Sequence, residues 1–234
     1  MLKNSLFGAN APIRITALAA LVAFGLVSCG DNDPGEPSVY AFEIYDDDLV
    51  VGDPSAPITI IEYSSFTCPH CAAFHEEVFP TLEEKYLKTG KASMVLRPFF
   101  WDSAAAKAAL LSNCVPDALK LKMTETLFAG QRVWIADPQG PQEGLVKIAR
   151  QAQISREGFQ ACLDDTKNKE WGQRHYVEAS QTYNIASTPT FMINGEKVGL
   201  ITNVEDLDRI MAKFVMQSEG VAPEGSEAEG SAEE

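Results

Sequence analysis

Two cysteines separated by two residues, Cys68 and Cys71, are the side chains of this chain best placed to do chemistry. Thiols at this spacing can form a disulfide with each other and exchange it with the thiols of another molecule. The attacking species is a thiolate, so one of the two sulfurs has to ionise below the ordinary thiol range. The spacing therefore predicts a redox reaction carried by a reversible disulfide.

The sequence around the cysteines predicts a strand followed by a helix. The strand-like run 58–66 leads into Cys68, and the apolar residues after Cys71 recur at helical spacing as far as about Lys88. Cys68 would then lie at the helix N-terminus, where unpaired backbone N–H groups and the helix dipole stabilise a thiolate. A strand that leads through Cys-x-x-Cys into a helix is the arrangement of a thioredoxin-like redox site.

The rest of the chain alternates between strand and helix patterns. The other predicted strands are 93–99, 190–194 and 197–201, the last two joined by an Asn194-Gly195 turn. The predicted helices after the first are 104–111, 117–129, 144–153, 156–183 with a break, and 204–216, which Asn203 caps. This order predicts an α/β fold interrupted by a helical segment.

The N-terminus has the features of an export signal. Lys3 and Arg14 are the only charges before residue 31, and the apolar run 15–27 is too short to span a bilayer comfortably. Leu26-Val27-Ser28-Cys29 resembles the lipobox of bacterial lipoproteins, in which the signal is cut before the cysteine and the cysteine carries lipid. The resemblance predicts a periplasmic protein tethered to a membrane through lipidated Cys29. An ordinary signal peptide and an uncleaved anchor with an incidental cysteine are the alternatives.

The chain is acidic. Its net charge is −14, and removal of residues 1–28 takes away two basic residues and no acidic one, which makes the mature charge −16. No cluster of Lys and Arg is present to neutralise phosphates, so nucleic acid is excluded as a partner. Residues 217–234 hold six glutamates and no basic residue and are predicted to be disordered.

Four cysteines remain once the lipid-bearing one is set aside. An even number of thiols in an exported chain favours disulfides, so Cys114 and Cys162 are predicted to form a second, structural bridge. On the loop-entropy model such a bridge stabilises the fold by ~4 kcal/mol. Two separate buried thiols are the alternative. A zinc site with Cys68, Cys71 and His75 as ligands, and with Cys114 or Cys162 as a fourth, is a further alternative, disfavoured because the chain has no second Cys-x-x-Cys.

With these features in place, the chain resembles the DsbA family of thiol:disulfide oxidoreductases over about residues 40–216. The resemblance rests on the segment 62–71, which ends in Cys-Pro-His-Cys, and on Thr188-Pro189-Thr190-Phe191. It implies an α/β, thioredoxin-like fold with an inserted α-helical domain. The implied organisation is a signal peptide (1–28), a tether (29–39), thioredoxin-like parts (40–102 and 185–216) around a helical insertion (103–184), and an acidic tail (217–234).

The resemblance also implies roles for the residues of the motif. Cys68 would be the nucleophile that forms mixed disulfides with substrates, and Cys71 would be the resolving thiol. His70 would hydrogen-bond to the Cys68 thiolate or stabilise its charge, an exposed histidine being the alternative. Pro69 would occupy the first helical turn, where its missing N–H costs nothing.

Three further residues follow from the same resemblance. Pro189 matches the cis-proline that faces the disulfide, and it would expose backbone groups of Thr188 to an extended substrate. A trans proline that opens a strand is the alternative. Glu62 matches an acid that relays a proton to the buried thiol, the alternative being an edge-strand glutamate that reaches solvent. His75 and His175 are interpreted as helix-surface or packing residues. Core or groove positions are expected for Trp101, Trp134 and Trp171.

These features predict an exported dithiol oxidase that needs no cofactor. Its partners would be reduced exported proteins and a membrane partner that reoxidises it. Thr188 fits a disulfide isomerase or reductase as well, because isomerases of this fold often carry Thr there, although residues 30–57 are too few for their dimerisation domain. A lipid-tethered binding module with a purely structural Cys68–Cys71 bridge is the alternative that is not an enzyme.

Overall fold

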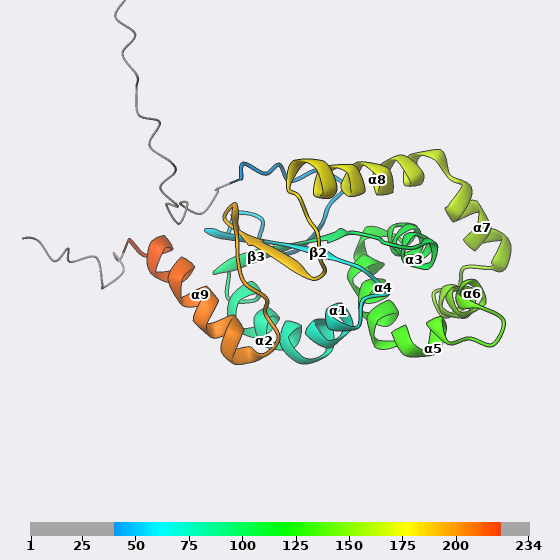
Figure 1. Cartoon of the computed structure of the whole chain (residues 1–234), viewed down its shortest axis with the longest axis horizontal. Coiled ribbons are helices and arrows are strands. Elements are labelled where there is room, and N and C mark those ends of the chain that lie inside the picture. Colours follow the sequence, from blue (N-terminus) through cyan, green and yellow to red (C-terminus); the bar gives the residue numbers. More distant parts are fainter. Residues whose placement is uncertain (1–39, 221–234) are drawn as a thin grey trace, which may run out of the picture. The chain divides into compact units, whose positions relative to one another are not determined.

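The computed structural model describes residues 40–220, in which helices cover both faces of a mixed sheet (Figure 1). The strands are β1 (Leu49–Gly52), β2 (Ile58–Ser64), β3 (Ala92–Pro98), β4 (Thr190–Ile193) and β5 (Glu196–Lys197). The α-helices are α1 (Pro69–Ala73), α2 (Phe79–Leu82), α3 (Ser103–Asn113), α4 (Asp117–Ala129), α5 (Gln131–Ile135), α6 (Pro141–Gln151), α7 (Arg156–Asp164), α8 (Thr166–Val177) and α9 (Val204–Ser218). The π-helical turns are η1 (Phe74–Val78), η2 (Glu83–Leu87) and η3 (Glu178–Thr182).

The sheet has the strand order β1-β3-β2-β4-β5. β2 and β3 run parallel, with Ile58 opposite Ala92 and Ser64 opposite Pro98, and the other neighbouring strands are antiparallel. β2 is paired on both sides, so all its residues except Thr59 are buried. The strand that leads to Cys68 is thus a central one, held from both edges.

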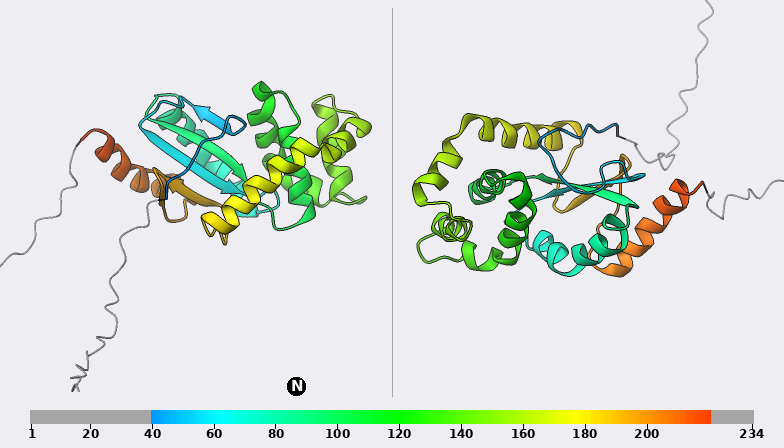
Figure 2. Two further views of the ribbon diagram at one scale, coloured as in Figure 1. Left: turned by 90° about the horizontal axis from the view of Figure 1, so that it is seen from above. Right: turned by 180° about the vertical axis from the view of Figure 1, so that it is seen from behind.

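Alternate residues of β2 face opposite sides of the sheet and enter different cores. Ile58 and Ile60 pack with η1, α2 and α9, whereas Ile61 and Tyr63 pack with the end of α8 and with η3. Figures 1 and 2 show α8 crossing one face of the sheet, with α1, α2 and α9 on the other. Glu62 shares the even-numbered face of β2, so its side chain points toward the helix that carries Cys71.

Helices α3 to α7 lie beyond the carboxyl ends of β2 and β3, where they form a third core (Figure 1). This core includes Phe66, Cys71 and Ala72 from the region of the Cys-x-x-Cys motif. The predicted helix 117–129 is confirmed to the residue by α4. The helical segment between β3 and β4 therefore packs directly against the start of the motif helix.

The predicted helix from Cys68 to about Lys88 is present, but two π-helical turns interrupt its α-helical spacing. η1 ends just before Pro80, which has no N–H for the carbonyl of Glu76 and whose ring would clash with that carbonyl in a regular α-helix. The N–H of Phe79 instead donates to the carbonyl of Phe74, five residues back. The proline therefore explains the first irregularity.

Four details differ from the predictions. The predicted strand 197–201 is wrong beyond Lys197, because the chain leaves the sheet after the Val198 N–H donates to Phe191 at 3.0 Å. The predicted tail begins two residues too early, because α9 continues to Ser218 and Glu219 still donates to Val215 at 3.0 Å. β1 and α5 were not predicted; both are short, at 4 and 5 residues.

The Asn194-Gly195 turn is confirmed, with φ values of 48° and 85° that suit a hairpin.

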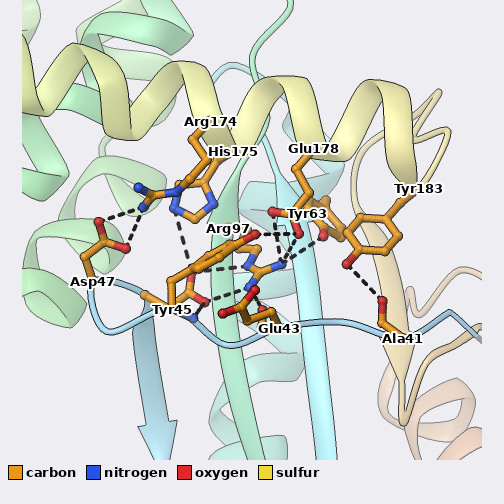
Figure 3. Close-up of polar contacts among 11 residues, drawn as sticks. Ala41, Glu43, Tyr45, Asp47, Tyr63, Arg97, Arg174, His175, Glu178 and Tyr183 are labelled. Atoms are coloured by element: carbon orange, nitrogen blue, oxygen red, sulfur yellow. Dashed lines mark hydrogen bonds and ion pairs between the residues drawn. The ribbon is translucent and has the colours of Figure 1, made fainter.

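A buried polar cluster attaches the segment before β1 to the sheet and to η3 (Figure 3). Arg97 on β3 donates to both carboxylate oxygens of Asp48, at 3.2 and 2.7 Å, and to the hydroxyl of Tyr63 at 3.2 Å. It also contacts Glu178 at 3.4 Å and donates to the carbonyl of Glu43. Burial opposes the charge of Arg97, but the hydrogen bonds and charge of Asp48 outweigh it and raise the pKa of the guanidinium. The cluster therefore joins three separate parts of the chain.

The predicted signal peptide (1–28), the lipidated Cys29 and the tether (29–39) lie outside the described residues, as do residues 221–234 of the tail. Within residues 40–220, no helix combines the length and apolar character that crossing a bilayer requires.

Candidate active site

The two thiols of the motif occupy different environments at the start of α1. Cys68 is the N-cap residue, with extended backbone (φ −82°, ψ 119°), and Pro69 fills the first helical position. Cys68 is half-buried, whereas Cys71 is fully buried and accepts a hydrogen bond from the Ser65 N–H at 3.4 Å. Both are free thiols here. One sulfur is accessible to a partner molecule and the other is not.

The same geometry separates the acidities of the two thiols. A hydrogen bond from the Cys71 thiol, together with the backbone N–H groups of Cys71 and His70, lowers the pKa of Cys68 to about 5 against the cost of burial. Burial, the hydrogen bond to Cys68 and the charge of Glu62 raise the pKa of Cys71 far above the ordinary thiol range. At neutral pH the reduced site therefore holds a Cys68 thiolate beside a protonated Cys71.

A pH titration of the reduced protein tests this separation. Because Cys68 is deprotonated above its pKa of about 5, its alkylation by iodoacetamide should be nearly independent of pH above neutrality. Below the midpoint the rate should fall about tenfold per pH unit as the thiolate is protonated. Thiolate ultraviolet absorbance should give the same midpoint and lose the transition in Cys68→Ser. A midpoint near 9, the value of an ordinary thiol, would contradict the assignment.

Thr188, the residue before Pro189, lies against Cys68 although it follows Cys68 by 120 residues. The Thr188–Pro189 bond is cis, and Cys68 Sγ lies 3.2 Å from the carbonyl oxygen of Thr188, which accepts a hydrogen bond from the thiol while Cys68 is protonated. Pro189 is buried, and Thr188 is half-buried at the start of β4. The predicted nucleophile, the cis-proline and the residue before it therefore form one site.

Glu62 is fully buried and hydrogen-bonded to His75, with 2.9 Å between Glu62 Oε2 and His75 Nε2. The interpretation of Glu62 as an edge residue that reaches solvent is wrong, because β2 is paired on both edges. His75 and His175 are both buried, so of the surface and packing interpretations only packing fits them. Trp134 and Trp171 are also buried, whereas Trp101 is exposed.

His70, by contrast, is exposed, and its ring makes no hydrogen bond to any residue in the range 40–220. Its backbone N–H is the group that contributes to the low pKa of Cys68. The predicted contribution of its imidazole stays a prediction.

Two residues that the sequence did not single out hold the loop before Cys68. The buried side chain of Gln131 in α5 donates to the carbonyls of Phe66 and Cys68, at 2.9 Å each. The carboxylate of Asp102, which caps α3, accepts a hydrogen bond from Thr67 at 2.7 Å. The helical segment thus fixes the chain from Phe66 to the nucleophile. A glutamine within the mostly apolar run 127–135 was the one signal available in the sequence.

Cys114 and Cys162 form a disulfide between the end of α3 and α7, with their Cα atoms 6.0 Å apart. They are therefore not available as metal ligands beside Cys68 and Cys71. Across residues 40–220, no three His, Cys, Asp or Glu side chains gather in an arrangement that could hold a metal ion.

Comparisons with known proteins agree with this geometry. A family model described as thioredoxin matches residues 45–213. A Rickettsia felis protein named as a protein-disulfide oxidoreductase is 29% identical over 168 residues, which are 72% of this chain. Disulfide bond formation protein D of Bacillus subtilis is 26% identical over 199 residues, covering 81% of this chain and 83% of that protein.

Among solved structures, Wolbachia pipientis alpha-DsbA1 is similar, with a TM-score of 0.69 and 28% identity. The match covers 76% of this chain and 95% of the Wolbachia chain. The predicted thioredoxin-like fold with a helical insertion is thereby confirmed. The chain spans only 60% of the length of the Rickettsia felis protein.

Proposed function

Since the chain belongs to the thioredoxin family and to its DsbA-like branch, we propose that it is a thiol:disulfide oxidoreductase that passes a disulfide to reduced proteins. The observation that carries the proposal is the asymmetry of its two thiols. Cys68 is accessible, with a pKa lowered to about 5, and Cys71 is buried, with its pKa raised. A nucleophile that is also a good leaving group, beside a protected resolving thiol, is what disulfide exchange requires.

The proposed reaction starts from the Cys68–Cys71 disulfide. A substrate thiolate attacks Sγ of Cys68 and forms a mixed disulfide, while the Cys68–Cys71 bond breaks and leaves its electron pair on Cys71. Cys71 takes up a proton because its thiolate is disfavoured by burial. A second substrate thiolate then attacks the substrate sulfur of the mixed disulfide. The substrate leaves oxidised, Cys68 remains a thiolate, and of the two substrate protons one is on Cys71 and one is released.

The cis Thr188–Pro189 segment supplies a place for the substrate backbone. Thr188 lies next to the sulfur that carries the mixed disulfide, and it precedes β4. An extended substrate can pair there by strand addition, which explains how the enzyme would accept many sequences. In this proposal Glu62 relays the proton that Cys71 takes up, as the family resemblance implies.

The low pKa of Cys68 favours the direction of oxidation. Stabilising the thiolate stabilises the reduced enzyme, which makes its disulfide a stronger oxidant. Thr188 is the feature that favours the second candidate, an isomerase or reductase of the same fold. The two candidates differ in the reduction potential of the same cysteine pair.

Equilibration with reduced and oxidised glutathione tests the direction. For an oxidase we expect a potential well above that of thioredoxin, toward the range of about −180 to −120 mV found for oxidising members of the superfamily. An oxidase with such a potential should also rapidly oxidise the thiols of a reduced, unfolded protein. A potential near about −270 mV would instead identify a reductase. Reactivation of a protein with scrambled disulfides, without net oxidation, would identify an isomerase.

We place this oxidase in the periplasm, tethered through lipid on Cys29, with reduced exported proteins as substrates and a membrane partner that reoxidises it. The support is the apolar run 15–27 followed by the lipobox-like segment 26–29. Two acyl chains would give stable anchoring, whereas one would be marginal. Loss of membrane association in Cys29→Ser would support the tether, and unchanged association would contradict it.

A further inference from the structure

The buried Glu62–His75 pair has two atoms for which the fold provides no partner. Glu62 Oε2 and His75 Nε2 are 2.9 Å apart, with 0% and 2% of the two side chains exposed. Glu62 Oε1 and His75 Nδ1 are buried and have no hydrogen-bond partner within residues 40–220. An unsatisfied buried polar atom costs about 1–3 kcal/mol. The free atoms are the two outer ends of the hydrogen-bonded pair, which is where a proton would enter and leave it.

Cys71 needs such a path. In each catalytic cycle its sulfur takes up a proton when the disulfide breaks and gives one up when the disulfide reforms, yet it is fully buried. Glu62 lies on the face of β2 that η1, α2 and α9 cover, and its charge acts on Cys71. Glu62 is itself fully buried, so a proton that it exchanges with Cys71 must come from another group.

Besides its contact with Glu62, His75 lines a pocket of about 250 Å³ together with Glu76, Glu83 and Glu125. This volume holds several water molecules, and the carboxylates give them polar partners. The ring of His75 is stacked on Phe128 with 4.2 Å between centroids and 15° between planes, which fixes its orientation. The two ring nitrogens of a histidine allow it to take a proton on one side and deliver one on the other.

We propose that His75 and this pocket form the proton route to the resolving thiol. A proton passes from pocket water to Nδ1 of His75, from Nε2 to Oε2 of Glu62, and from Oε1 to Sγ of Cys71 as the disulfide opens. The same transfers run in reverse when Cys71 attacks a mixed disulfide. His75 is a positioning residue, because it acts through Glu62 and does not touch the reacting sulfurs. The inference rests on the proposed function only in requiring that the two cysteines exchange disulfides.

The test is the rate at which Cys71 resolves a mixed disulfide preformed between Cys68 and glutathione. His75→Gln keeps a donor for Glu62 but cannot transfer a proton, so we expect release of glutathione at neutral pH to slow by at least about tenfold. Glu62→Gln should slow it similarly. The double variant should be no slower than the slower single variant, because both residues serve one route.

The pH profile separates a relay from a structural effect. Without the relay, hydroxide has to remove the Cys71 proton, so the rate in His75→Gln should rise about tenfold per pH unit over a range where the wild type changes less. The other titratable groups around His75, which are Glu62, Glu76, Glu83 and Glu125, are unchanged in this variant. In His75→Ala, added imidazole should restore part of the rate.

The controls keep the outcomes distinct. Glu77→Gln, an exposed neighbour on η1 outside this pocket, should behave as wild type. Thermal unfolding of each variant shows that it is folded. A wild-type rate and pH profile in His75→Gln, or equal rescue of Glu62→Gln by imidazole, would overturn the proton route. Failure of the wild type to form or resolve the mixed disulfide would instead overturn the proposed function.

Discussion

Replacing Cys68 by serine is expected to abolish disulfide transfer to a reduced, unfolded protein. Serine cannot form the mixed disulfide, and its hydroxyl does not ionise as the Cys68 thiol does at a pKa of about 5. Because removal of a covalent nucleophile leaves only binding, the rate should fall by ~10³-fold or more. The measurement is the appearance of disulfides in the substrate, followed by the loss of its free thiols. Substrate oxidation at the wild-type rate would mean that the Cys68–Cys71 bridge is only structural.

Replacing Cys71 by alanine should give the opposite chemical outcome. Cys68 remains able to form a mixed disulfide, but no internal thiol is left to resolve it, so the covalent adduct should accumulate. Alanine suits the fully buried position of Cys71 because it adds no polar group. Intact-mass measurement after mixing with an oxidised peptide shows the adduct directly. The absence of any adduct in this variant would show that Cys68 is not the sulfur that substrates attack.

The sequence predicted the parts of the site that local pattern encodes. The apolar run before Cys68 and the helical spacing after Cys71 were enough to place β2, α1 and the nucleophile at their junction. Asn194-Gly195 predicted the hairpin for the same reason, because both residues adopt the positive φ that this turn requires. These signals lie within a few residues of the feature that they predict.

The contacts that surround the two active-site cysteines join residues far apart in the sequence, and no periodicity of apolar residues predicts them. His75 follows Glu62 by 13 residues, and Gln131 reaches the Cys68 carbonyl across 63 residues. A polar residue in an apolar run indicates a buried partner without identifying it, so Glu62 could be suspected but not paired. Only the central place of β2, paired with β3 and β4, shows that Glu62 cannot reach solvent.

The largest effect on stability is expected from Arg97→Met. Arg97 and Asp48 are both completely buried, and the substitution leaves the Asp48 carboxylate without its bidentate partner. Removing one partner of a buried ion pair costs about 3–5 kcal/mol, because an uncompensated charge remains in the interior. Equilibrium denaturation of the oxidised protein should show this loss in the free energy of unfolding. The carbonyl of Glu43 and the hydroxyl of Tyr63 lose their donor as well.

A surface pair of the same chemistry supplies the matched control. Arg156 pairs with Glu143, but 47% of the Arg156 side chain is exposed, so Arg156→Met should lower the free energy of unfolding far less than Arg97→Met does. Adding Asp48→Asn to Arg97→Met removes the stranded charge, so the double variant should be more stable than the sum of the two single losses predicts. Equal losses in Arg97→Met and Arg156→Met would mean that the cluster in Figure 3 does not hold residues 43–48 to the sheet. A loss confined to Arg97→Met would show that the segment before β1 is fixed to β3 by this buried charge pair.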